Sequence, residues 1–315
     1  MGPAFGALLG VLVFCHLASI AAAADIFYDG EGHVRSRTCR FHVIGDIAPG
    51  DGDLFRRKML RAIDEGCLPV KVVLYSAGGD LHAAIDIGRQ LSALNMHTEA
   101  PDVWMSEGEP PERRFNKTRY CHFRGKAFSY NPATEQGDRN CVCASACFFI
   151  WVAGTKRFGN VVIIHRPYFD PKVYSNLPVG DAQKHFAELT RAAQQYLASL
   201  EIPEALITRM LSISSREGSF LSDREIKQLR SRRFFEELVI ARCGRTEREV
   251  NGVANEAAKR AEEALKKRGK EPTAGNLVNA MIGATTEQVI CEGKVHADLL
   301  SHGKGEYALK YGLPP

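Results

Sequence analysis

The sequence predicts an α/β fold with mostly parallel strands and a helical appendage towards its C-terminal end. Between residues 41 and 94, short β-branched stretches alternate with amphipathic stretches of helical period. Such alternation is typical of parallel sheets covered by helices. The chain has 315 residues, 45% of them hydrophobic, and is therefore long enough to bury a large core.

The first half of this alternation contains two strands and two helices. We expect strands at 41–47 (FHVIGDI) and 71–77 (KVVLYSA), because both are short and rich in apolar residues. Helices are expected at 54–66 and 80–94, where apolar residues recur at helical spacing. Gly78-Gly79 stands between the second strand and its helix, where glycine permits a sharp backbone turn.

The second half begins at 141–154, CVCASACFFIWVAG, which we expect to become a buried helix after Ser145. A β-branched strand follows and ends at His165, and a long amphipathic helix is expected at 181–200. Shorter helices are expected after Pro203 and at Ser222, which forms a capping-box pattern with the glutamate three residues on. The stretch FFEELVIARC is expected to be the closing strand.

Two segments depart from this pattern. Residues 101–140 are rich in proline, glycine and charge, and we expect an inserted loop, tied by Cys121 to either Cys141 or Cys143. In the tail, Thr246 and Glu249 predict a capped helix that runs to Gly269. Its apolar stripe is mostly alanine, which favours a weakly packed surface helix over a coiled coil. Cys243 and Cys291 flank this tail and are placed to join its ends.

The first 24 residues contain no charged side chain and end in Ala22-Ala23-Ala24. We interpret residues 1–24 as a secretory signal peptide cleaved before Asp25, so that the protein is exported to the periplasm or secreted. The apolar run has no basic residue ahead of it, and an uncleaved inner-membrane anchor facing the periplasm is the alternative. Cleavage leaves eight cysteines, and an even number in an exported chain indicates disulfides.

Composition and motifs narrow the range of partners. A net charge of +4, from 41 basic and 37 acidic residues, gives no reason to expect nucleic acid binding. Cys141 and Cys143 lack a second pair to complete a zinc site, and SAGGD matches no nucleotide-binding loop. We therefore expect no metal and no cofactor, and contact with a membrane only if the leader stays uncleaved.

Three features could have a catalytic or binding role, and each could also have a purely structural role. Gly78-Gly79 leaves backbone amides open to an anion, or simply makes a tight turn. Ser145 is either a nucleophile on a tight turn or an ordinary helix N-cap. His165 is either a structural histidine or a base at the carboxyl end of a strand, where sites in α/β sheets gather.

The order of these features resembles the Clp protease proteolytic subunit family, within the wider crotonase-like fold. The shared order is a strand, S-x-G-G-D, a helix, a serine in A-S-A, another helix, and a strand ending in His-Arg-Pro. The chain is more closely similar to exported bacterial Clp-protease-like proteins that carry C-x-S-x-C around the serine. The resemblance covers residues 41–242. We therefore expect a Clp-protease-like domain at 25–242 and a cysteine-bounded appendage at 243–315.

The resemblance implies roles for individual residues. Ser145 matches the nucleophilic serine of the family, and His165 matches its base. Gly79 and Ala146 match the positions whose backbone N–H groups form the oxyanion hole. The helix at 181–200 matches the long helix through which such subunits assemble into rings, which implies a homo-oligomer.

The third catalytic residue of the family has no counterpart here. The resemblance places an aspartate near Gly218, where the sequence reads SSREGSFLS. Glu217 is adjacent and is our candidate substitute, with Asp170 and Asp223 as weaker ones. Without such a carboxylate the histidine is poorly oriented, so a Ser–His pair and a loss of activity both remain open.

Several hypotheses follow. The first is an exported serine peptidase that works without ATP on a peptide or protein substrate, through Ser145 and His165. The second is a catalytically inactive module that binds a peptide or protein in the same place. A crotonase-type enzyme acting on coenzyme A thioesters fits an exported location poorly. A Ser–Lys mechanism would need Lys184, which we expect to be solvated on an amphipathic helix.

Overall fold

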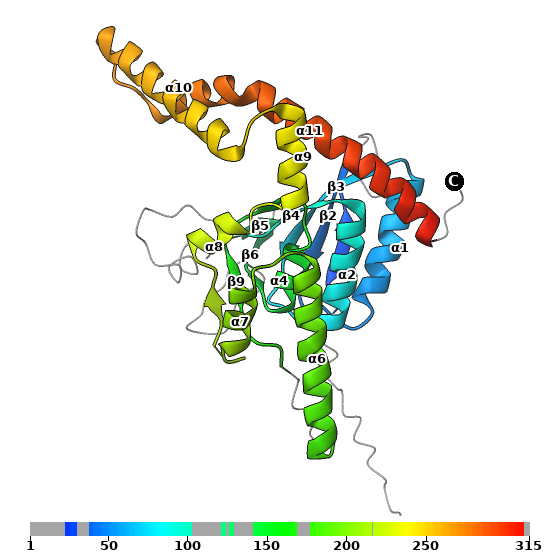
Figure 1. Ribbon diagram of the computed structural model, residues 1–315. Coiled ribbons are helices and arrows are strands. Elements are labelled where there is room, and N and C mark those ends of the chain that lie inside the picture. The colour runs from blue at the N-terminus through cyan, green and yellow to red at the C-terminus, as the bar shows by residue number, and fades with distance from the viewer. Residues whose placement is uncertain are drawn as a thin grey trace, which may run out of the picture.

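The computed structural model describes residues 23–29, 38–102, 141–168, 177–215 and 217–311, together with the backbone of residues 121–123 and 126–128 (Figure 1). The predicted leader and most of the predicted insertion lie outside these residues. Among the helices of the described part, none has the length and the apolar character needed to cross a membrane.

Two sheets organise the described part, and most of their strand pairs are parallel. The main sheet has the spatial order β1 (Asp25–Tyr28), β2 (Thr38–Ile44), β3 (Leu68–Tyr75), β4 (His97–Glu99) and β8 (Arg157–Phe158). The second sheet has the order β10 (Ser219–Phe220), β9 (Val162–Ile164) and β7 (Cys143–Ala144). Only β1–β2 and β9–β10 are antiparallel within these two sheets. The prediction of a mixed α/β fold with parallel strands is confirmed.

Helices surround the sheets. They are α1 (Asp51–Asp64), α2 (Leu81–Leu94), α4 (Ala146–Trp151), α6 (Val179–Ser199), α7 (Glu204–Ser212), α8 (Asp223–Gln228), α9 (Arg233–Cys243), α10 (Glu247–Lys267) and α11 (Ala274–Tyr311). Most of the buried apolar side chains form one large core, with smaller clusters at the second sheet and at α9. Every residue of α4 is buried, and its Trp151 donates a hydrogen bond from Nε1 to the carbonyl of Phe158, at 2.9 Å. This bond and the contacts of α4 with β3, β4 and α2 fix the short helix against the main sheet.

The main sheet meets the second sheet at the carboxyl end of β3. Ser76 forms a parallel bridge with Cys143, and its N–H donates to the carbonyl of Val142 at 2.9 Å. Strand β9 then pairs with the other side of β7, in parallel. The carboxyl ends of three neighbouring strands therefore reach one place, as expected for the site of an α/β protein.

The long helix α6 is half packed and half exposed. Its second half buries Leu189, Ala193 and Tyr196, and the Tyr196 hydroxyl donates to the carbonyl of Phe149 at 3.0 Å. Its first half projects from the body (Figure 1), and Val179 there is 74% exposed. The helix predicted at 181–200 is therefore present, and only one half of it is held by the fold.

The C-terminal helices form a hairpin whose second arm returns to the body. The capping box of Thr246 and Glu249 is present at the start of α10, and only Ala254 of that helix is buried. Helix α11 pairs with α10 and then runs back over α1 and α2 (Figure 1). These contacts cross the boundary expected at residue 243, and the division of the chain there remains a prediction.

The returning arm of α11 is anchored by specific contacts. The Tyr307 hydroxyl donates to Oε1 of the buried Gln90 at 2.6 Å. A Cβ on Gly303 would lie 2.8 Å from the carbonyl oxygen of Ala93, so α11 approaches the end of α2 closely there. The His296 ring stacks on His97 of β4, with ring centroids 3.4 Å apart.

Two predictions of local structure are wrong. The stretch FFEELVIARC lies entirely in α9 and not in a strand, because Phe235 and Val239 share one buried face at helical spacing. Arg233 and Glu237 also pair at i,i+4 along that helix. The insertion is not a plain loop either, since the backbone at Cys121–Phe123 (β5) pairs antiparallel with Lys126–Phe128 (β6).

The disulfides resolve part of the cysteine pattern. Cys243 bonds to Cys291, which confirms that these cysteines join the ends of the tail. Cys39 bonds to Cys67, and Cys143 bonds to Cys147. The alternative in which Cys121 pairs with Cys143 is therefore excluded. Cys141 is also disulfide-bonded, but the predicted tie from Cys121 involves a side chain outside the described residues.

Candidate active site

Ser145 occupies a sharp turn between strand β7 and helix α4. Its backbone has φ 56° and ψ −121°, and it is one of three non-glycine residues with positive φ in the described chain. Its side chain accepts no bond from the first turn of α4, so it does not act as an ordinary N-cap. A strained turn of this kind, from strand to helix, presents a serine hydroxyl away from the backbone.

Gly78 lies directly against this turn. A Cβ added to Gly78 would lie 2.6 Å from Cβ of Ser145 and 3.0 Å from the carbonyl oxygen of Ala144. Its φ of 118° is also in the region that favours glycine. Only glycine therefore lets the loop after β3 come this close to the serine.

Gly79 is fixed on its other side by Ile47. The N–H of Ile47 donates to the carbonyl of Gly78, and the N–H of Asp80 donates to the carbonyl of Ile47. A Cβ on Gly79 would lie 2.0 Å from that same Ile47 oxygen. The glycine pair is thus held between Ile47 and Ser145, with no space for a side chain.

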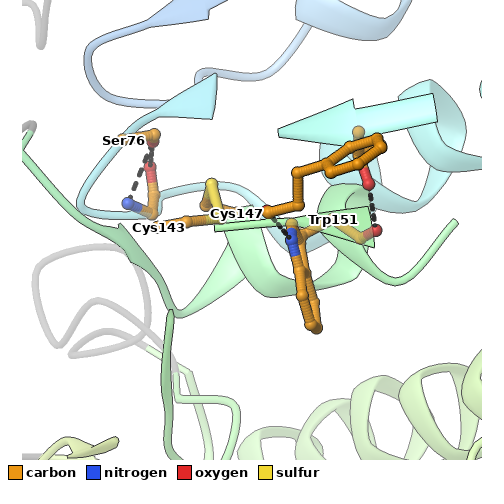
Figure 2. Close-up of a disulfide and its surroundings, with 7 residues drawn as sticks. Ser76, Cys143, Cys147 and Trp151 are labelled. Carbon is orange, nitrogen blue, oxygen red and sulfur yellow. Dashed lines mark hydrogen bonds between the residues drawn. A yellow bond between two sulfur atoms is a disulfide. The ribbon is translucent and has the colours of Figure 1, made fainter. Parts of the chain in front are cut away.

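Ser76 organises the loop from within. It is fully buried, its hydroxyl accepts the N–H of Gly78 at 3.1 Å, and it donates to the carbonyl of Gly78 at 3.3 Å (Figure 2). This occupies the Gly78 amide. Within the described residues, the N–H groups of Gly79 and Ala146 have no acceptor. These are the two amides assigned to an oxyanion hole by the family resemblance.

A disulfide encloses the serine turn. Cys143, the first residue of β7, bonds to Cys147 in the first turn of α4, so the bridge spans Ser145 (Figure 2). Both cysteines are fully buried. The bond joins the strand and the helix on either side of the strained residue and so limits how far the turn can relax.

His165 follows the last residue of β9, next to the strand that precedes Ser145. The N–H of Ser145 donates to the carbonyl of Ile163 in β9, at 3.1 Å. Nδ1 of His165 lies 2.8 Å from the carbonyl oxygen of Arg166. Because a carbonyl oxygen only accepts, Nδ1 carries the proton and Nε2 is left as a basic nitrogen. No hydrogen bond joins Ser145 to His165 among the described residues.

The strand register places Gly218 opposite His165. In the antiparallel pair β9–β10, Ile164 faces Ser219, so the register continued by one residue sets His165 opposite Gly218. Gly218 has no side chain to offer. Glu217 is exposed, and no hydrogen bond or ion pair joins it to His165 in the described part of the chain.

The remaining candidates are distributed more widely. Lys184 is exposed on the projecting half of α6, and Asp223 is exposed at the start of α8. Asp170 lies outside the described residues. Among those that are described, no group of three or more histidine, cysteine or acidic side chains is arranged to hold a metal ion.

Ser76 and the pairing of Cys143 with Cys147 were not predicted. A serine two residues before a glycine is a common turn pattern, so S-x-G-G could have indicated the bonds made by Ser76. The cysteine pairing has no comparable signal, because eight cysteines allow many connectivities.

Comparisons with known proteins add a likeness of fold. No protein-family model matches the chain, and no curated protein matches its sequence. Among solved structures, the chain is similar to a mutant of ClpP1 from Listeria monocytogenes. That match has a TM-score of 0.37 and 14% sequence identity, over 61% of this chain and 86% of the other. This is a partial likeness of fold, and it says nothing of the chemistry of the site.

Proposed function

We propose that the protein is an exported serine hydrolase that cleaves peptides without ATP. Ser145 Oγ attacks the carbonyl carbon of the substrate, and His165 Nε2 takes the hydroxyl proton. The amides of Gly79 and Ala146 hold the negative charge that develops on the carbonyl oxygen. His165 then gives the proton to the leaving amine, which leaves an acyl group on Ser145. Water, activated by His165, hydrolyses this acyl-enzyme and restores the free serine.

The strained turn at Ser145 is the observation that carries this proposal. A positive φ at a non-glycine residue costs on the order of 1–3 kcal/mol and persists only where surrounding structure imposes it. Here Gly78, Ser76 and a disulfide surround the turn. An ordinary helix start does not need these supports. A serine that is held in a strained conformation beside two unoccupied amides does need them.

The main-chain carbonyl of Arg166 supports a Ser–His pair without a carboxylate. It accepts from Nδ1 and so selects the tautomer in which Nε2 is basic. A carbonyl carries no full charge, however, so it stabilises the imidazolium less than an aspartate does. The proposed enzyme is therefore slow relative to one with a complete triad.

Gly218, which stands where the family resemblance places the catalytic aspartate, favours a second candidate function. With Gly218 opposite His165, the same turn could hold a peptide carbonyl in the oxyanion hole without cleaving it. In that case the protein is an exported binding module for a peptide or a protein.

Labelling with a fluorophosphonate probe separates the two. We expect wild-type protein to form a covalent adduct at Ser145, located by peptide mass spectrometry. Ser145→Ala and His165→Ala should abolish the adduct while circular dichroism and the unfolding midpoint stay close to wild type. A well-folded wild type that never labels would leave the binding module as the better account.

We further propose that the protein assembles with copies of itself through the projecting half of α6. Val179 there is 74% exposed and Phe186 is 39% exposed, and covering these apolar side chains with a second copy would be favourable. Val179→Asp should lower the mass measured by light scattering after size-exclusion chromatography. An unchanged mass, or a wild type that is monomeric, would contradict this.

A further inference from the structure

A cavity of about 440 Å³ lies where the ends of α6, α7, α8 and α9 meet strand β8. Its charged lining residues are Arg157, Arg232, Arg233, Glu201 and Glu236. Leu200, Pro203 and Leu229 supply apolar wall. No residue of the Ser145 site lines this cavity, and the activity proposed above does not use it.

Arg157 is the unusual member of this lining. Its side chain belongs to β8, and the residue is only 3% exposed. Nη1 donates to the carbonyl of Leu229 at 2.6 Å and lies 3.4 Å from the carbonyl of Ser231. Nε and Nη2 are buried, and neither has a hydrogen-bond partner in the described part of the chain. A buried cation in this condition is costly unless an anion completes its contacts.

A second guanidinium faces the same space. Arg232, the residue before α9, donates from Nη1 to Ser92 Oγ at 2.7 Å. Its Nε is also buried without a partner among the described residues. Burial first, and then the charge of Arg232, lower the pKa of Arg157 to about 9, so Arg157 keeps its charge at neutral pH. Glu201 and Glu236 oppose this lowering at longer range, and neither forms an ion pair with Arg157.

Two helix N-termini add to the attraction for an anion. Pro203 precedes α7 and Arg232 precedes α9, and both line the cavity. Neither helix start has a side-chain cap. Unfilled N–H groups at such ends favour negative charge. The carbonyl of Leu229, at the end of α8, accepts a hydrogen bond from Arg157. It therefore repels an anion in the cavity less than a free carbonyl would.

We propose that this cavity binds an organic carboxylate through Arg157 and Arg232. A guanidinium presents its N–H groups in a planar arrangement that matches a carboxylate. Leu200, Pro203 and Leu229 are suited to the hydrocarbon part of the ligand, which is either a free acid or the C-terminal residue of a peptide.

Isothermal titration calorimetry of the purified protein at pH 7 and constant ionic strength tests this. The probes are isovalerate for a free acid, N-acetyl-leucine for a peptide C-terminus, N-acetyl-leucinamide as its uncharged match, and inorganic phosphate. We expect at least one of the two carboxylates to bind, and the tighter one to identify the source. The amide should bind at least about tenfold more weakly than N-acetyl-leucine, because it lacks the charge that the guanidinium groups recognise.

Variants locate the binding. Arg157→Met and Arg232→Gln should each weaken carboxylate binding at least about tenfold. Arg242→Gln is the matched control, because Arg242 is on α9 but pairs with Asp298 away from the cavity. If Arg157→Met does not fold, carboxylate binding by Arg232→Gln is the measurement that tests the proposal.

Three results would overturn the proposal. They are a folded wild type that binds neither carboxylate in the millimolar range, equal binding by Arg232→Gln, and tighter binding of phosphate than of both carboxylates. Because Ser145→Ala should bind the carboxylates as wild type does, failure of the proposed hydrolase leaves this result unaffected.

Discussion

The serine side and the histidine side of the candidate site differ in how firmly they are held. Ser145 is fixed by the contact with Gly78, by the loop that Ser76 organises and by the Cys143–Cys147 disulfide. His165 has one hydrogen bond to a neighbouring backbone carbonyl and faces a glycine across the strand pair. The first side depends on backbone geometry that many residues impose together, whereas the second depends on a single side chain.

This difference separates what the fold provides from what one substitution can remove. A turn with open amides can bind a carbonyl whether or not a base stands beside it. Turnover additionally needs an oriented base, and in the proposed enzyme the Arg166 carbonyl is the group that orients His165, with no carboxylate at position 218. Substitutions on the serine side and on the histidine side should therefore have separable effects on labelling.

Gly79→Ala should break the serine side completely. The added Cβ would lie 2.0 Å from the Ile47 oxygen, and the φ of Gly79 is 133°. We expect the fluorophosphonate labelling rate to fall by about 100- to 1,000-fold, as when an oxyanion donor is lost. The free energy of unfolding in urea should fall by about 3 kcal/mol.

Gly66→Ala is the control for this change. Gly66 also has a positive φ, 83°, but no atom lies within 4 Å of an added Cβ. It should cost about 1 kcal/mol from backbone strain alone and leave labelling unchanged. A labelling rate for Gly79→Ala equal to that of Gly66→Ala would refute the role of Gly79.

Gly218→Asp should strengthen the histidine side. A Cβ at Gly218 would lie 2.6 Å from Cγ2 of Ile163, so the change is combined with Ile163→Ala. The new carboxylate can accept from His165 and stabilise its charged form. We expect labelling at least about tenfold faster than that of the Ile163→Ala single variant. Equal rates in two folded proteins would mean that the histidine is not limited by a missing carboxylate.

Of the disulfides Cys143–Cys147 and Cys243–Cys291, only the one at the serine turn should affect labelling, although its loss should cost less stability than loss of the other. Cys143→Ala with Cys147→Ala opens a loop of sequence separation 4 and should cost about 2 kcal/mol. Cys243→Ala with Cys291→Ala opens a separation of 48 and should cost about 4 kcal/mol. The first pair should slow labelling several-fold, and the second should not change it. The reverse pattern would show that the turn does not need its bridge.

Acid should loosen the contact between α11 and the body. This contact is remote from Ser145, so we expect no effect of it on labelling measured at neutral pH. Burial is the main cause that lowers the pKa of His97 to about 2 and that of His296 to about 4. Both values are below the ordinary pKa of about 6.5, so the fold favours the neutral rings. The stability that they confer is complete above pH 6.5 and is lost as the pH falls towards 4.

Urea unfolding at pH 7 and pH 5 measures this effect. We expect a loss on the order of 2 kcal/mol for each of the two histidines, or about 4 kcal/mol in all, for the wild type at pH 5. His296→Phe keeps an aromatic ring against His97 and should show a smaller loss. If its pH dependence equals that of the wild type, the stacked pair is not the acid-sensitive element.

The sequence was informative where local pattern and packing agree. Small residues around Ser145 predicted a tight turn, and a β-branched run predicted a strand ending at His165. It failed where tertiary contacts decide the outcome. Residues 234–243 are apolar enough for a strand, and only the shared burial of Phe235 and Val239 makes them a helix. Strand β8 is too short to have a period of its own, so Arg157 gave no sign of its burial.

The return of α11 has a consequence for the order in which the chain can fold. Gln90 is buried in α2 early in the sequence, and its side-chain oxygen is bonded by Tyr307. During synthesis the ribosome releases α2 long before residue 307. Until then α2 exposes the surface that α11 later covers, and incompletely covered surface of this kind favours association between chains. Completion of the body thus has to wait for the synthesis of α11.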